Sequence, residues 1–81
     1  MEYSKDYMPT QEDIQKVMNL GSQYWLDMLK KAQDLGMNHI NTELVTSIIS
    51  HLNKHNKLSA KQAKVLIIMA RSVRYRIEKQ Q

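Results

Sequence analysis

Apolar residues recur at every third or fourth position in three successive blocks of this chain. That spacing gathers apolar side chains on one face of an α-helix, whereas a half-buried strand needs strict alternation. No stretch alternates apolar with polar residues, and the good helix formers Leu, Met, Lys, Gln and Ala dominate. The sequence therefore predicts an all-α fold. With 81 residues the chain is near the lower limit for unaided folding, so we expect a single domain.

The first helix is predicted over residues 11–35. Thr10 is a suitable N-cap, with Asp13 at the position that completes a capping box. Gly21 falls within the apolar stripe without changing its phase, which favours one continuous helix. A break there is the alternative, because glycine costs about 1 kcal/mol inside a helix. Gly36 is typical of a helix end. The stripe consists of Ile14, Val17, Met18, Gly21, Trp25, Met28, Leu29 and Ala32.

Two shorter blocks predict two further helices. Asn41 is a suitable cap for a second helix that runs to about residue 53, and Ser59 with Gln62 matches the S-x-x-Q capping box of a third helix over about 60–79. The connections are short, so we expect a small three-helix bundle in which the first helix packs on an αα-hairpin. The third helix is apolar around more of its circumference, which favours a central place or a second contact with a partner. The two apolar faces comprise Leu44, Val45, Ile48, Ile49 and Leu52, then Ala63, Leu66, Ala70, Val73 and Ile77.

Residues 1–9 are predicted to form a tail outside the domain at 10–81, because the proline that ends them cannot continue a helix. Tyr3, Tyr7 and Met8 make this tail apolar enough to dock on the bundle or on a partner. Its composition lacks the layout of a signal peptide, and the longest apolar run, 65–70, is too short to span a bilayer. Without cysteine there are no disulfides either, so we expect a cytoplasmic protein with no membrane contact.

Charge is distributed unevenly along the chain. Residues 1–50 carry four basic and seven acidic side chains, whereas residues 51–81 carry eight basic side chains and only Glu78 against them. Basic side chains along one helix face can follow a phosphate backbone, and Tyr75 can stack on an exposed base. A solvated basic face is the alternative. The predicted nucleic-acid-binding residues are Lys54, Lys57, Lys61, Lys64, Arg71, Tyr75 and Lys79.

A second interpretation is a protein-binding adaptor, or an inhibitor of a host or defence protein. Val65, Ile68 and Met69 lie partly outside the apolar stripe of the third helix. Together with Tyr3 and Tyr7 they would form a hydrophobic contact. A third interpretation is a structural homo-oligomer that pairs through the same apolar excess.

Catalytic and metal-binding chemistry find little support in the sequence. The serines have no recognisable base-and-orienter partners, and there is no glycine-rich phosphate loop. His51 and His55 have the i, i+4 spacing of two zinc ligands, but the glutamate of the H-E-x-x-H motif is missing and there is no cysteine. We therefore predict a protein without catalytic residues, metal, cofactor or small-molecule substrate.

Residues 45–69 resemble a helical hairpin that recurs in small phage and mobile-element proteins. In that hairpin an apolar helix and a short basic turn precede a Leu-Ser-x-Lys-Gln motif that opens a second apolar helix. Asn56 stands where the pattern usually has a glycine before the leucine. The resemblance covers about a third of the chain and implies a nucleic-acid or nucleoprotein setting, such as replication, recombination or host takeover. The matching residues are Leu58, Ser59, Lys61, Gln62 and Leu66.

Overall fold

The computed structural model describes residues 8–80, with the side chains of residues 8–79. Within that part, the chain forms the helices α1 (Gln11–Asp34), α2 (Thr42–His55) and α3 (Ala60–Gln80), and no strand. The predicted all-α, three-helix architecture is confirmed. The two tail tyrosines that were predicted to dock lie outside the described residues.

Each helix begins at the cap that the sequence predicts. At α1 the Asp13 amide donates to the Thr10 hydroxyl oxygen (3.2 Å) and the Thr10 amide donates to the Asp13 carboxylate (3.0 Å). At α3 the Gln62 amide donates to the Ser59 hydroxyl oxygen (3.2 Å) and the Ser59 amide donates to the Gln62 side chain (2.9 Å). Both capping boxes therefore satisfy amides that would otherwise lack a helical partner. At α2 the side chain of Asn41 accepts from a single amide, as an N-cap does.

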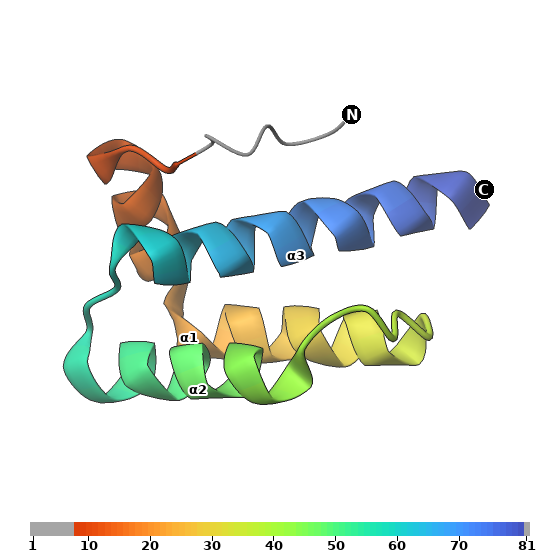
Figure 1. The fold of residues 1–81 in the computed structure, drawn as a ribbon, viewed down its shortest axis with the longest axis horizontal. Coiled ribbons are helices and arrows are strands. Elements are labelled where there is room, and N and C mark those ends of the chain that lie inside the picture. The colour runs from red at the N-terminus through yellow and green to blue at the C-terminus, as the bar shows by residue number, and fades with distance from the viewer. Residues whose placement is uncertain (1–7, 81) are drawn as a thin grey trace.

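α1 bends sharply in its middle. Gly21 has φ 87° and ψ 159°, a region that glycine alone adopts readily. The structure therefore takes the broken alternative, and the unbroken helix favoured by the apolar stripe is wrong at this residue. The stripe records only which face is apolar, and it carries no information on the dihedral angles at a residue without a side chain. In Figure 1 residues 11–20 run across the direction of residues 22–34.

Side chains that follow Gly21 in the chain hold the bend in place. A helix end leaves the carbonyls of its last turn without helical partners. Here the buried indole of Trp25 donates from Nε1 to the carbonyl of Val17, at 2.9 Å. The ring of Tyr24 meets the Trp25 ring edge-on, with 5.0 Å between centroids. Ser22 ties the second half of α1 to α2, because its hydroxyl donates to the Asn53 side chain at 3.1 Å.

α1 is the central helix of the bundle. It makes the main helix–helix contacts with both α2 and α3, which approach each other closely in few places. In Figure 1 the second half of α1 lies along α2 at the bottom of the view, and α3 runs above both of them, antiparallel to α2. The expectation that the last helix is central is therefore wrong. Because α1 bends, it packs against both α2 and α3.

The core draws on all three helices and on one loop residue. Met37 was predicted to lie in a connecting loop, and it does, but its side chain is buried. Pro9 was assigned to the tail, yet it is buried too. Leu44, by contrast, was placed on an apolar face and is exposed. The buried apolar residues are Ile14, Val17, Trp25, Leu29, Ala32, Met37, Val45, Ile48, Ile49, Leu52, Ala63, Leu66, Met69, Ala70 and Val73.

Candidate functional site

The turn between α2 and α3 places several basic residues at one corner of the molecule. α2 ends at Asn56, which adopts a left-handed conformation (φ 51°, ψ 40°) while its amide donates to a carbonyl one turn back. Asparagine is one of the few residues that tolerate this conformation, so it can stand where the phage-type hairpin has glycine. Lys54 precedes this cap, and Lys57 and Lys61 follow it. All three side chains are exposed.

The basic residues continue along the outer side of α3. Lys64 and the apolar Ile68, in the first half of α3, are half-buried, whereas Arg71 and Lys79 further along the helix are exposed. A helix of 21 residues is about 30 Å long, so this row is long enough to pass several phosphates. Glu78 is the single acidic side chain on α3. The predicted nucleic-acid-binding residues therefore lie on the turn and on one side of α3.

Tyr75 is available for contact, although one face of its ring is in use. Its side chain is 56% exposed, the largest exposure among the exposed large hydrophobics of the described residues. The ammonium of Lys79 lies over the ring at 5.6 Å from the centroid, within cation–π range. The Tyr75 ring and the Lys79 ammonium are therefore presented together at the surface of α3.

The apolar contact predicted on α3 is smaller than expected. Met69 is only 2% exposed and belongs to the core, so it cannot form part of a surface. Val65 is half-buried and packs against the same core. Both therefore pack into the core, to which α1 and α3 contribute. Of the residues predicted to form this apolar contact, the half-buried Ile68 is the described one that does not pack against the core. Tyr3 and Tyr7 lie outside the described residues.

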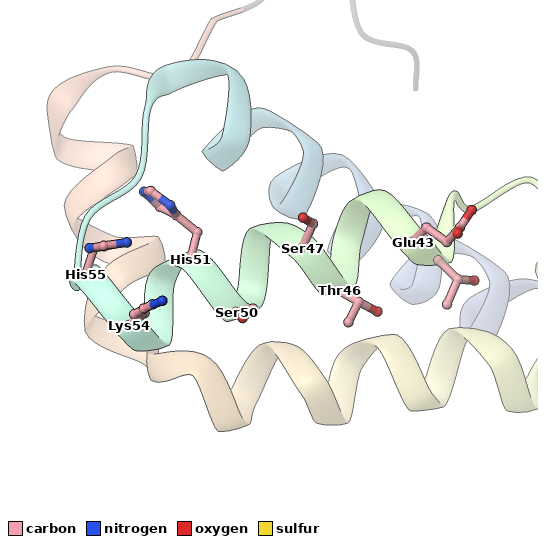
Figure 2. A pocket seen from close by; sticks show the side chains of 8 residues that line it. Glu43, Thr46, Ser47, Ser50, His51, Lys54 and His55 are labelled. Atoms are coloured by element: carbon pink, nitrogen blue, oxygen red, sulfur yellow. The ribbon is translucent and has the colours of Figure 1, made fainter.

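A broad, open hollow lies on the outer face of α2 (Figure 2). Figure 2 shows His51 and His55 on successive turns of the helix, and their ring centroids are 4.7 Å apart. Among the described residues, no group of three or more His, Asp or Glu side chains is placed to hold a metal ion. The hollow is lined by hydroxyl, imidazole and charged groups: Thr42, Glu43, Thr46, Ser47, Ser50, His51, Lys54 and His55. Its Lys54 end adjoins the basic turn.

A second hollow was not predicted from the sequence. It is about 260 Å³ in volume and lies between α1 and α3 at the Gly21 bend, with lining residues from both halves of α1. Its two walls are about fifty residues apart in the chain, and an Arg74 guanidinium donates to the Tyr24 hydroxyl across it at 3.4 Å. The one available signal was the alternative of a break at the glycine. The lining comprises Asp13, Lys16, Val17, Leu20, Tyr24, Trp25, Ile67, Ala70, Arg71 and Arg74.

No described helix is both long enough and apolar enough to cross a membrane. Protein-family models, curated proteins and solved structures yield no match to the chain. Function is therefore inferred from the chain's own surfaces.

Proposed function

We propose that this protein is a small, non-enzymatic accessory protein that binds nucleic acid, or a nucleoprotein enzyme, through the basic turn and the outer side of α3. The observation that supports this proposal is the series of cationic side chains along the turn and α3, which are exposed except for the half-buried Lys64. We call this surface the basic face. It consists of Lys54, Lys57, Lys61, Lys64, Arg71, Tyr75 and Lys79.

The chemistry of the basic face suits phosphate better than a specific base. Lysine is a point charge on a flexible stem, which positions a phosphate without reading sequence. Tyr75 adds a partly open ring, and stacking on it is tolerant of base identity. We therefore expect binding with weak sequence preference. If about four to five phosphates are contacted, affinity falls about two orders of magnitude between 50 and 200 mM salt.

The hairpin that residues 45–69 resemble supports a phage or mobile-element setting as part of this proposal. Such a protein would act in the cytoplasm of a host cell, as an accessory or regulator of nucleic-acid processing. In this setting its partner is the nucleic acid or the enzyme that works on it, and it needs no small-molecule substrate.

The test is fluorescence anisotropy with labelled single-stranded and double-stranded oligonucleotides at about 50 and 200 mM salt. We expect steeply salt-dependent binding that the double variant Lys57→Glu, Lys61→Glu largely abolishes. Both side chains are exposed, so the fold is retained. The matched control is Lys30→Glu, Lys31→Glu, which changes the net charge equally at exposed positions on α1. This control keeps most of the affinity.

Absence of binding at low salt, or equal losses in both double variants, would reject the basic face as the binding surface. Salt-insensitive association with one protein would instead favour the adaptor or inhibitor. For that alternative, the half-buried Ile68 is the apolar residue of α3 to replace first. A molecular mass that rises with concentration in the absence of any partner would favour the homo-oligomer.

A further inference from the structure

The hollow inside the Gly21 bend, which we call the bend groove, combines an apolar floor with a charged rim. Val17 and Trp25 are buried beneath it. At the rim Leu20, from the last turn before the bend, is 49% exposed. Ile67 on the α3 wall is half-buried. An apolar side chain entering the groove would therefore leave water on several sides at once.

The rim of the bend groove is positively charged. Lys16 comes from α1, and Arg71 and Arg74 come from α3. Asp13 is the one carboxylate in the lining, and its Oδ2 already accepts the Thr10 amide in the capping box. Carboxylates of a partner would meet Lys16 and Arg74 from opposite walls. The complementary ligand is therefore anionic around an apolar centre.

The floor fits an aliphatic side chain better than a nucleotide base. Stacking on an aromatic face is the main contact of unpaired bases. Trp25 is 2% exposed, and Tyr24 is half-buried with its ring edge-on against Trp25, so neither offers an open face. The volume of about 260 Å³ is also below the usual range for drug-sized ligands. It matches one protein side chain with part of its backbone.

We propose that the bend groove binds an acidic segment of a partner protein, which inserts one aliphatic side chain between α1 and α3. Flanking carboxylates of that segment pair with Lys16 and Arg74. Arginine side chains beside a small apolar pocket are typical of the anchor points of protein interfaces. Lys16, Leu20, Ile67 and Arg74 of the groove lie outside the basic face, whereas Arg71 belongs to both surfaces. The proposal does not depend on nucleic-acid binding. With both surfaces occupied, the protein would join a nucleic acid to an acidic protein.

Trp25, the single tryptophan of the chain, provides the readout because it forms the floor. The probes are short synthetic peptides with one leucine between glutamates, titrated while Trp25 fluorescence is recorded. Two control peptides replace either the glutamates by glutamine or the leucine by serine. We expect saturable binding of the acidic leucine peptide, and about tenfold weaker binding of each control, a difference of about 1.4 kcal/mol.

Variants of the rim locate the peptide. Lys16→Glu and Leu20→Ser alter exposed side chains, so the fold is retained and circular dichroism checks it. Each is expected to weaken the acidic peptide about tenfold. The matched control Lys30→Glu lies on α1 outside the groove and leaves peptide binding unchanged.

Equal binding of the glutamine or serine peptide, or unchanged binding by Leu20→Ser, would overturn the proposal. Because Arg71 belongs to both surfaces, competition is measured in the Lys57→Glu, Lys61→Glu variant. Displacement of the peptide by an oligonucleotide in that variant would assign the groove to nucleic acid instead. Because Lys57 and Lys61 lie outside the groove, their double variant should bind the peptide normally. Failure of the groove and failure of the basic face are thus separate results.

Discussion

The chain changes direction at the Gly21 bend and again at the α2–α3 turn, and the two are built differently. The turn is held by short-range bonds: the amide of Asn56 donates to the Leu52 carbonyl at 2.8 Å, and the Ser59 capping box follows directly. The bend is held by the hydrogen bond from the Trp25 indole to the carbonyl of Val17, eight residues earlier in the chain. It also depends on the packing of α1 against α3. One is determined locally and the other by tertiary structure.

Each change of direction also shapes one of the two proposed binding surfaces. The turn presents Lys54, Lys57 and Lys61 at one corner, where the basic face begins. The bend places Lys16 and Leu20 of α1 opposite residues of α3, and the bend groove lies between them. A locally specified turn suits a surface that needs only exposed charge. A groove needs walls from distant segments, and only tertiary packing can bring those together.

The largest effect is expected where the bend is held. Trp25→Ala removes a buried ring together with its bond to Val17, and should lower the free energy of unfolding by about 3–5 kcal/mol. The control is Tyr75→Ala, an exposed aromatic on α3, with an expected change within about 0.5 kcal/mol. Urea denaturation followed by circular dichroism measures both. Similar losses in the two variants would contradict a bend anchored by Trp25.

Gly21→Ala should be the next most costly change. Nothing lies within 4 Å of a Cβ built at this position, so any cost comes from the backbone. The conformation at φ 87°, ψ 159° costs a non-glycine residue about 1–3 kcal/mol. We also expect weaker binding of the acidic leucine peptide, since a straightened α1 loses the groove. Gly36→Ala is the control: its φ of 71° is also positive, but it lies outside the groove, so peptide binding should not change.

The turn offers a smaller effect. Ser59→Ala removes the hydroxyl that accepts the Gln62 amide and should destabilise the protein by about 1 kcal/mol. Ser50→Ala, at an exposed position within α2, is the matched control and should change stability by less than about 0.5 kcal/mol. Thermal unfolding resolves this difference. Equal stability of the two variants would mean that the capping box contributes nothing to the turn.

The smallest effect is expected at Asn56→Gly. The residue is already left-handed at φ 51°, a conformation that glycine adopts freely, so stability should change by only a few tenths of a kcal/mol. Asn56→Val, with a branched side chain in the same conformation, should cost about 1–2 kcal/mol. The comparison is again made by urea denaturation. A large loss in the glycine variant would show that the turn depends on the asparagine side chain rather than on its backbone conformation.

The sequence predicted what local chemistry determines. The caps at Thr10, Asn41 and Ser59 and the helix limits within two residues follow from side-chain spacing and hydrogen-bonding groups. The all-α fold follows from the same spacing. These contacts span three or four residues, so they can be recognised without knowing the rest of the structure.

The packing of the helices against one another could not be predicted from such local contacts. The apolar spacing at Gly21 was compatible with a straight helix, and the bend depends on packing around Trp25. The burial of Met69 follows from where α1 crosses α3, which periodicity on α3 alone does not reveal. For the same reason the basic face could be listed from the sequence, whereas the bend groove, with Lys16 and Arg74 on its opposite walls, could not.

The most direct test of the basic face is amide chemical-shift mapping by NMR during titration with a single-stranded oligonucleotide. We expect the perturbed amides to cluster from Lys54 to Lys61 and along the Lys64, Arg71 and Tyr75 side of α3, with little change at Leu20. Perturbations centred on the second half of α1, or none at saturating oligonucleotide, would contradict a nucleic-acid surface built on the turn and α3.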